Sequence, residues 1–272
     1  MTELTPWRTA RDEDGHALAE ALDEIARPAA AAIAAAYARR ADHQPRRKSD
    51  GSPVTEVDVL ADALLTGGLR RRFPDWPVVS EEAPASHARA PAGPYWLLDP
   101  LDGTREFIGG TGEFCICLAL VESGVPVFGF VYAPLDLRYD YAWRGAGCAY
   151  AKTAHAPPRR LTRPRPPARA SSGLRVGVSR HHRDAATDAF LATLREPLAL
   201  PMGSALKFCA IAEDRLDVYV RHGPTMHWDT AAGQCLLEAV GFGVYDLATG
   251  APLRYDTPTR RNPGFLAGPF GP

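Results

Sequence analysis

The chain has no long apolar run, no surplus of charge of one sign and few cysteines. No segment approaches the roughly 20 consecutive apolar residues of a membrane-spanning helix, so no stable membrane insertion is expected. The polar stretch from Met1 to Asp14 lacks the features of a secretory signal peptide. The formal net charge is −1, which argues against nucleic acid or an anionic membrane as a partner attracted by bulk charge. Attraction for a phosphorylated ligand must therefore be local.

The few cysteines that are present each lie in an apolar segment, and none forms a C-x-x-C pair: Cys115, Cys117, Cys148, Cys209 and Cys235. We interpret them as small buried hydrophobic residues rather than as disulfides or metal ligands. This interpretation predicts a cytoplasmic protein and leaves open a peripheral association with the inner membrane. The chain also lacks a G-x-S-x-G motif and a Cys/His arrangement near its acidic motifs, so no side chain is an obvious covalent nucleophile.

Helix and strand patterns are present throughout the first half of the chain. Apolar periodicity predicts helices over 16–40 and 55–72 and strands near 77–80, 95–98, 114–121, 125–133 and 139–143. Pro28 should kink or restart the first helix, because proline lacks the N–H group that an α-helix needs. Both alternating faces of the strand 114–121 are apolar, so helices should cover both sides of its sheet.

The second half alternates strands with helices, which predicts another sheet with helical layers. Its expected strands cover 174–179, 198–201, 216–221 and 242–247, and its expected helices cover 184–195, 204–213 and 229–240. Prolines and arginines between the halves predict a linker or exposed loop without regular structure over 153–173. Its arginines are interpreted as solvated, with an anion-binding arm as the alternative. The expected parts are an N-terminal α+β domain (1–152), this linker (153–173) and a C-terminal α/β domain (174–272).

Asp99 and Asp102 follow an apolar run that predicts a buried strand, and a Gly103-Thr104 pair follows them. The glycine permits a tight turn, and the threonine can cap a following helix. Hard oxygen ligands favour Mg²⁺, and the free N–H groups of a helix start favour an anion. A metal and an anion at one turn suggest a phosphate ester held for hydrolysis.

Two further segments carry acids at element ends. Ser80-Glu81-Glu82 follows a strand-like run, and the segment from Trp228 to Gly233, with Asp229, opens a helical run. Taken singly, each of these acids could be a surface or capping carboxylate. Taken together they would repel one another strongly in a cleft without cations. Two Mg²⁺ ions about 4 Å apart would neutralise them and bridge a phosphate.

In this order, the acidic pair, D-P-L-D-G-T and W-D-T-A-A-G resemble the Mg²⁺-dependent inositol monophosphatase superfamily over nearly the whole chain. The resemblance implies an α/β (α+β) fold, a layered α-β-α-β-α sandwich with its active site between the two halves. It implies two Mg²⁺ ions, with a third, weaker one near Glu81, and inhibition by Li⁺. The metal ligands that it implies are Glu81, Asp99, the Leu101 carbonyl, Asp102 and Asp229.

The same resemblance implies catalytic roles for Asp58, Thr104 and Glu81. Thr104 and Asp58 would orient a metal-activated water and help to deprotonate it. Local sequence supports another interpretation of Asp58 equally well, as a helix-start residue in a Thr55-x-x-Asp58 capping arrangement. Lys48 is either a basic residue near the metals or a solvated loop lysine.

Several segments are similar to bacterial 3′(2′),5′-bisphosphate nucleotidases of the CysQ type. The clearest is Arg105-Glu106-Phe107, which replaces the T-N-F that follows D-G-T in most inositol monophosphatases. The substrate-binding residues that the resemblance implies are Gly103, Thr104, Ser204, Lys207 and Arg221. Lys207 lies three positions after Ser204 at an expected helix start, so the two should share one face. A solvated helix lysine is the alternative there. His182 is either near the substrate or an exposed loop histidine.

The implied reaction is removal of the 3′-phosphate of adenosine 3′,5′-bisphosphate to give AMP and phosphate, which clears a by-product of sulfate assimilation. 3′-Phosphoadenylyl sulfate is a candidate second substrate. The alternatives are an inositol monophosphatase or another small phosphomonoesterase of the superfamily, a non-catalytic nucleotide-binding regulator, and an RNA-associated protein that uses the arginine-rich linker. The sequence leaves the oligomeric state open.

Overall fold

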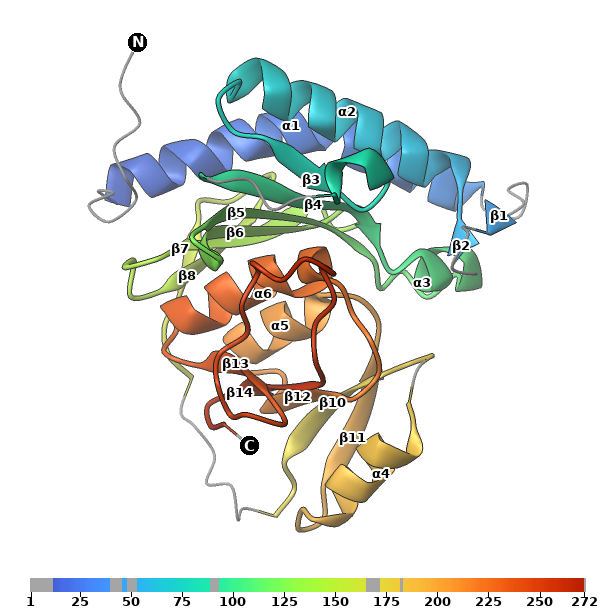
Figure 1. Ribbon diagram of the computed structural model, residues 1–272, viewed down its shortest axis with the longest axis vertical. Helices are drawn as coiled ribbons and strands as arrows, with labels where there is room; N and C mark the ends of the chain where they lie inside the picture. Colours follow the sequence, from blue (N-terminus) through green and yellow to red (C-terminus); the bar gives the residue numbers. More distant parts are fainter. Residues whose placement is uncertain are drawn as a thin grey trace.

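A computed structural model describes residues 12–39, 46–47, 53–88, 93–164, 172–181 and 183–271. These residues form two β-sheets that alternate with helical layers in the order α-β-α-β-α (Figure 1). The layered sandwich implied by the sequence motifs is therefore confirmed. Lys48, His182 and residues 165–171 of the expected linker lie outside the described residues. In the described part of the chain, no helix is both long and apolar enough to cross a bilayer.

The helices form three layers around the two sheets (Figure 1). They are α1 (Asp12–Ala38), α2 (Glu56–Arg72), α3 (Thr104–Gly109), α4 (Ala185–Ala192), α5 (Leu206–Ala212) and α6 (His227–Ala239), with a short 3₁₀ turn, η3, at Pro84–Ser86. Helix α1 continues through Pro28, so of the two expected effects, a kink or a restart, the restart was wrong. Its fully buried residues on both sides of the proline, among them Leu22 and Ile33, provide packing that offsets the missing hydrogen bond.

The first sheet has seven strands in the order β3-β4-β5-β6-β7-β8-β9. They are β3 (Val78–Ser80), β4 (Tyr95–Asp102), β5 (Cys115–Glu122), β6 (Val125–Ala133), β7 (Arg138–Trp143), β8 (Ala149–Thr153) and β9 (Arg159–Leu161). The predicted strands are present, but β8 was not predicted, and β9 contradicts the expectation of no regular structure across 153–173. Strand β9 is possible because its three residues fall between Pro158 and Pro164 and pair only with β8.

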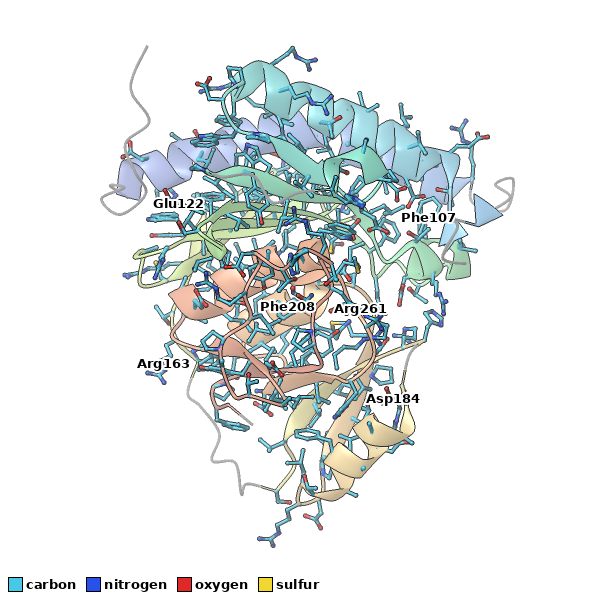
Figure 2. All side chains as sticks on the ribbon, viewed as in Figure 1. Phe107, Glu122, Arg163, Asp184, Phe208 and Arg261 are labelled. Atoms are coloured by element: carbon cyan, nitrogen blue, oxygen red, sulfur yellow. The ribbon has the colours of Figure 1, made fainter. Side chains whose placement is uncertain are left out.

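Helices cover both faces of this sheet, as the apolar strand 114–121 predicted. Leu118 and Leu120 of β5 pack in one cluster with α1 and α2, whereas Cys117 and Ala119 pack in another cluster with α5 and α6. Figure 2 shows Phe208 among the side chains on the α5 and α6 side of the sheet. Helix α6 approaches closely because β6 has a glycine at Gly129, where a Cβ atom would lie 2.4 Å from a backbone oxygen of α6.

The second sheet has five strands in the order β11-β10-β12-β14-β13. They are β10 (Arg175–Ser179), β11 (Leu198–Met202), β12 (Val218–Arg221), β13 (Gly243–Asp246) and β14 (Phe265–Gly268). The prediction lacked β14, which pairs antiparallel with both β12 and β13. A small separate pair joins β1 (Arg46–Arg47) to β2 (Pro53–Val54). The first sheet ends inside the expected linker, with β9, and the second sheet begins after it, with β10. The division into domains stays a prediction.

An irregularity in the pairing of β4 with β5 positions the acidic motif. Asp99 lies opposite Cys117 and Asp102 lies opposite Cys115, so two residues of β4 face one residue of β5 between these pairs. In a regular strand, residues three positions apart point to opposite faces. The bulge adds one residue and returns Asp102 to the face that Asp99 occupies. Pro100, which has no N–H group, is tolerated at such a break in the ladder.

Candidate active site

Three carboxylates from separate elements meet at one point. Oxygen atoms of Glu81, Asp99 and Asp229 lie within 4.8 Å of one another. Glu81 follows β3, and its N–H group donates to the Leu98 carbonyl of β4 at 3.0 Å, which holds the turn beside Asp99. Asp229 comes from the first turn of α6 in the second half of the chain. The structure therefore brings together three of the predicted metal-ligating side chains.

The carboxylates of this cluster carry like charges that repel one another. Burial raises the pKa of Asp99 well above its ordinary value, and the charges of Glu81, Asp102 and Asp229 raise it further. Burial, Asp102 and Glu81 likewise raise the pKa of Asp229. Clustered carboxylates of this kind are costly without a cation, and their hard oxygen donors are those that Mg²⁺ prefers. The donor set therefore suits a divalent metal ion.

Asp102 lies beside this trio and makes different contacts. Its Oδ2 atom accepts the N–H group of Ala205, at the start of the second-half segment that leads into α5. Burial raises the pKa of Asp102 to about 7, although Lys207 and the Ala205 N–H group lower it. The buried carbonyl of Leu101 accepts the Thr104 hydroxyl at 3.3 Å. Both predicted ligands thus lie at the same turn as Asp99.

Asp58 makes the contacts that both interpretations of it require. Its Oδ2 atom accepts the backbone N–H group of Thr55 at 2.7 Å and the hydroxyl of Thr55, which is the capping arrangement at the start of α2. Its Oδ1 atom accepts the Thr104 hydroxyl at 3.0 Å. One carboxylate therefore closes a helix start and contacts the predicted partner 46 positions away.

Thr104 does not cap the helix that follows it, contrary to the expectation. The N-cap of α3 is Gly103, with a positive φ of 98°, and a Cβ atom there would lie 3.0 Å from the Glu113 carbonyl oxygen. This close approach confirms the tight turn predicted at Gly103. Because Thr104 is the first residue inside the helix, its hydroxyl is directed to Asp58 rather than to the N–H groups of its own helix.

Asp229 also differs from a simple cap. It is the third residue of α6, and its Oδ2 atom accepts the Met226 N–H group at 2.8 Å. The same carboxylate lines the cavity described next. Asp58 and Asp229 therefore use one oxygen to close a helix start, and this contact fixes where the rest of each carboxylate lies.

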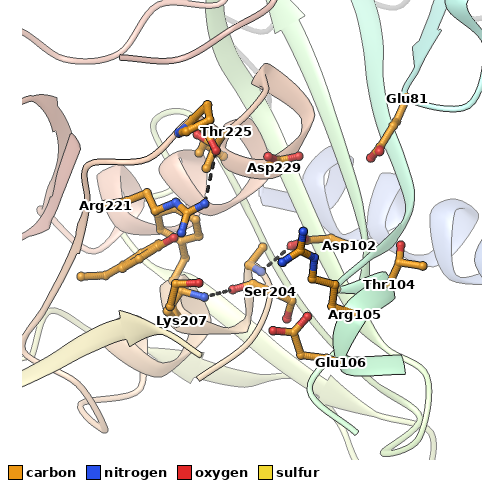
Figure 3. Close-up of a pocket in the computed structure, with 17 residues that line it drawn as sticks. Glu81, Asp102, Thr104, Arg105, Glu106, Ser204, Lys207, Arg221, Thr225 and Asp229 are labelled. Atoms are coloured by element: carbon orange, nitrogen blue, oxygen red, sulfur yellow. Dashed lines mark hydrogen bonds between the residues drawn. The ribbon is translucent and has the colours of Figure 1, made fainter. Parts of the chain in front are cut away.

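A cavity of about 230 Å³ joins the acids to basic side chains of the second half (Figure 3). The predicted residues that line it are Glu81, Asp102, Gly103, Thr104, Ser204, Lys207, Arg221 and Asp229. The lining residues to which sequence reasoning gave no role include Arg105, Glu106, Ser179, Tyr219 and Thr225. Arg105 and Glu106 belong to the recognised R-E-F segment, which was a usable signal. Tyr219 gave no signal, because an aromatic residue in a strand usually indicates core.

Lys207 is buried, so the alternative of a solvated helix lysine was wrong. Its ammonium group donates to the carbonyls of Met202 at 3.0 Å and Ser204 at 2.7 Å, and it lies 4.7 Å from the centre of the Tyr219 ring. Burial lowers its pKa to about 8, opposed by the charges of Asp102 and Glu106. Ser204 precedes α5 with a positive φ of 51°. The two therefore meet through the Ser204 carbonyl rather than on one helix face.

Arg221 occupies the last position of β12 and directs its guanidinium group toward the loop before α6 (Figure 3). Its Nη2 atom donates to the Pro224 carbonyl at 3.3 Å. Arg221 and Lys207 therefore provide two cationic groups on the second-half wall of the cavity. The acids lie mainly on the opposite wall, as Figure 3 shows for Asp102 and Glu81. Such a cavity can hold a divalent metal and an anionic ligand together.

Comparisons with known proteins show which family this chain is similar to. The model of the inositol monophosphatase family matches residues 14–267. The 3′(2′),5′-bisphosphate nucleotidase CysQ of Salmonella typhimurium is 41% identical over 253 residues, which cover 90% of this chain and 97% of the relative. The crystal structure of CysQ from Bacteroides thetaiotaomicron has a TM-score of 0.73 at 30% identity and covers 93% of this chain and 97% of its own. A structure of an IMPase/NADP phosphatase complexed with Mg²⁺ and phosphate has a TM-score of 0.65 at 19% identity, covers 84% of this chain and 82% of its own, and shows likeness of fold alone.

Proposed function

This chain belongs to the inositol monophosphatase family of metal-dependent enzymes, and we propose that it is a Mg²⁺-dependent 3′(2′),5′-bisphosphate nucleotidase. It hydrolyses adenosine 3′,5′-bisphosphate to AMP and phosphate in the cytoplasm. One observation carries the proposal: a single cavity is lined by the carboxylates of Glu81, Asp102 and Asp229 together with the basic groups of Lys207 and Arg221. Relatives named as such nucleotidases match most of this chain at 34–41% identity.

The acidic wall would hold the metal. Glu81, Asp99 and Asp229 supply the clustered oxygens, and Asp102 and the Leu101 carbonyl lie at the same turn. We propose two Mg²⁺ ions, with a third, weaker one near Glu81. Bound Mg²⁺ would neutralise the carboxylates, lower the pKa of a water molecule and contact the phosphate oxygens.

Thr104 and Asp58 would orient and deprotonate the attacking water. The Thr104 hydroxyl donates to Asp58 Oδ1, so its oxygen can accept a hydrogen bond from a water in the cavity that Thr104 lines. Asp58 is buried, with an exposed fraction of 1%, and does not itself line the cavity. A proton from the water would therefore reach Asp58 through the threonine hydroxyl.

The second-half wall would select the substrate. A nucleoside bisphosphate carries a phosphate besides the one that is hydrolysed, and this group needs its own positive partner. Lys207 and Arg221 provide that charge, and Ser204 lies beside them. The N–H groups of Gly103 and Thr104 would bind the reacting phosphoryl group at the start of α3. A substrate with a single phosphate would use only the acidic wall and α3.

The test is phosphate release from adenosine 3′,5′-bisphosphate and inositol 1-phosphate, run side by side with Mg²⁺ and with EDTA. We expect Mg²⁺-dependent turnover with a strong preference for the bisphosphate, and loss of turnover in a folded Asp99→Asn variant. Preference for inositol phosphate would leave the metal site in place and overturn the substrate assignment. Absence of turnover with either compound would contradict the proposed activity.

A further inference from the structure

Two cysteine thiols lie directly against the carboxylate of Asp102. Its Oδ2 atom is 3.9 Å from Cys115 Sγ and 4.0 Å from Cys117 Sγ. The two sulfur atoms are 3.7 Å apart. Mg²⁺ binds oxygen ligands, so the proposed metal chemistry gives these thiols no role. Their interpretation as plain hydrophobic filling does not account for their convergence on one oxygen atom.

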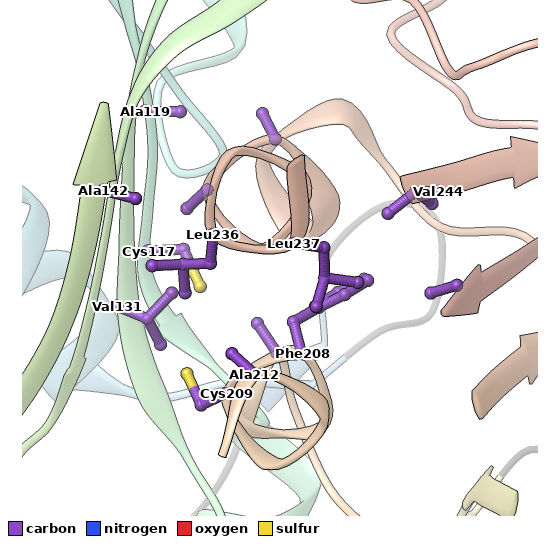
Figure 4. Close-up of a cluster of buried hydrophobic side chains, with 14 of the residues drawn as sticks. Cys117, Ala119, Val131, Ala142, Phe208, Cys209, Ala212, Leu236, Leu237 and Val244 are labelled. Carbon is purple, nitrogen blue, oxygen red and sulfur yellow. The ribbon is translucent and has the colours of Figure 1, made fainter. Parts of the chain in front are cut away.

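The bulge in β4 produces this convergence. Because Cys115 and Cys117 are two positions apart on β5, their side chains point to the same face of the sheet. The register places Asp102 opposite Cys115, and the bulge turns its carboxylate to that face. Figure 4 shows Cys117 extending from the sheet toward the helix that carries Leu236. Both thiols are buried in the cluster between the sheet and helices α5 and α6.

The three atoms have the spacing of ligands around a zinc ion. Tetrahedral zinc, with bonds of about 2.3 Å to sulfur and about 2.0 Å to oxygen, places two sulfurs about 3.8 Å apart and a sulfur and an oxygen about 3.5 Å apart. The observed sulfur–sulfur separation of 3.7 Å matches this value, and the sulfur–oxygen separations of 3.9 and 4.0 Å exceed it by about 0.4–0.5 Å. A zinc ion therefore needs little rearrangement of these side chains.

The surroundings permit a cation at this point. The N–H group of Ala205 also donates to Asp102 Oδ2, but a carboxylate oxygen can accept a second partner. Asp102 lines the active-site cavity, so the cavity leads from solvent to the carboxylate that both thiols contact. Thiolates select soft metals such as zinc and cadmium over Mg²⁺.

We propose that Asp102, Cys115 and Cys117 form a binding site for Zn²⁺ that competes with the catalytic metal for Asp102. On binding, each thiol releases its proton to solvent, and a sulfur–metal bond forms in its place. The ion would hold Asp102 Oδ2 on the thiol side and so inhibit turnover. The inhibition rests on the proposed function of Asp102 as a Mg²⁺ ligand, whereas the binding does not.

Cadmium titration of the full chain in excess Mg²⁺ tests the binding through the ultraviolet thiolate-to-cadmium absorption band. We expect a saturable band with one equivalent, abolished separately by Cys115→Ala and by Cys117→Ala. The matched control is Cys148→Ala, because Cys148 is equally buried but donates to the Ala146 carbonyl instead. X-ray absorption of the zinc-loaded wild-type protein should show two sulfur atoms in the first shell, a result that does not depend on any variant folding.

An absent band, a band that persists in both variants, or a zinc shell without sulfur would overturn the proposal. Zn²⁺ should also inhibit phosphate release, and the half-inhibitory concentration should rise at least tenfold in each cysteine variant relative to Cys148→Ala. A protein that binds cadmium through these thiols but does not hydrolyse the bisphosphate would contradict the proposed function and leave the zinc site standing. A protein that hydrolyses the bisphosphate but shows no cadmium band would overturn the zinc site and leave the proposed function standing.

Discussion

Replacing Asp58 by asparagine separates its catalytic contact from its capping contact. The carboxylate accepts the Thr55 N–H group and hydroxyl on one oxygen and the Thr104 hydroxyl on the other. Asparagine has only one acceptor oxygen. Because the Thr55 N–H group can only donate, that oxygen should face Thr55 and the amide N–H₂ should face Thr104. Thr104 would then accept a hydrogen bond there, and its own proton would turn to the Leu101 carbonyl at 3.3 Å, so it could no longer pass to residue 58.

The expected effect is large on turnover and small on stability. Loss of the proton acceptor should lower kcat by about 10²–10⁴-fold, the usual contribution of a positioned general base. The hydrogen bond from the Thr55 N–H group to residue 58, which closes the start of α2, is retained. The free energy of unfolding should therefore fall by only about 1 kcal/mol, the net contribution of one hydrogen bond. In a chain of this size that corresponds to a drop in Tm of about 2–4 °C.

The assay is phosphate release from adenosine 3′,5′-bisphosphate at saturating Mg²⁺, with thermal unfolding measured on the same samples. Thr55→Ala is the matched control: it removes the hydroxyl that donates to Asp58 but leaves the contact with Thr104. It should lose a similar amount of stability and keep activity within a few fold. If both variants lose activity equally, or if Asp58→Asn is fully active, Asp58 is a capping residue and the proton route is wrong.

Three further predictions concern charge and packing. Burial lowers the pKa of Lys207 to about 8, so kcat/KM for the bisphosphate should fall above that pH. Lys207→Met should abolish this decrease at high pH and raise KM by about 10–100-fold. An unchanged pH profile in the variant would contradict a binding role of Lys207. The folded pKa of Asp102 is raised to about 7, so the folded protein binds more protons than the unfolded chain between about pH 4 and 7. In EDTA, wild-type stability should therefore fall with rising pH relative to Asp102→Asn, and Mg²⁺ should restore it; parallel curves would refute this. Gly129→Ala places a Cβ atom 2.4 Å from the Ala232 oxygen and should cost about 1–3 kcal/mol. It should also weaken Mg²⁺ binding, because α6 carries Asp229. The control is Gly93→Ala, at a position with open space around the added Cβ atom, which should change neither stability nor Mg²⁺ binding. Equal effects of the two variants would disprove the link between helix packing and metal binding.

The prediction of secondary structure failed where the local signal was weak or ambiguous. Strand β9 was missed because prolines on both sides suggested a loop, although an edge strand needs hydrogen bonds on one side only. Strand β14 was missed because its four residues (Phe265–Gly268) carry little periodicity and are stabilised by pairing with β12 and β13. Thr104 was predicted as the N-cap of α3, but the N-cap is Gly103 and Thr104 is the first helical residue. The sequence Gly-Thr does not distinguish these two positions.

The acids of the candidate site could be proposed because each lies at the end or start of an element and belongs to a motif that resembles the family. Asp99 and Asp102 end a strand, Glu81 follows one, and Asp58 and Asp229 occupy the third position of a helix, where a carboxylate closes the helix start. Apolar residues on both faces of 114–121 required helices on both sides of the first sheet, whereas the full layered architecture was implied by the resemblance of the motifs to the family. The positions of the acids at element ends and the two apolar faces of the strand are both patterns among residues that are near in sequence, so they can be recognised from the sequence.

Long-range pairing decided the rest. The bulge between β4 and β5 places Asp102 on the face of Asp99 and against two thiols, and no pattern within either strand specifies that register. Lys207 is buried because its side chain lies over the second sheet, against the Met202 carbonyl of β11 and the Tyr219 ring of β12, although its spacing alone permitted a solvated position. Sequence, through its local patterns and its resemblance to the family, therefore identified the candidate metal ligands and the elements in which they lie. The tertiary structure alone determined which of them meet, because a contact between distant segments depends on how whole layers pack.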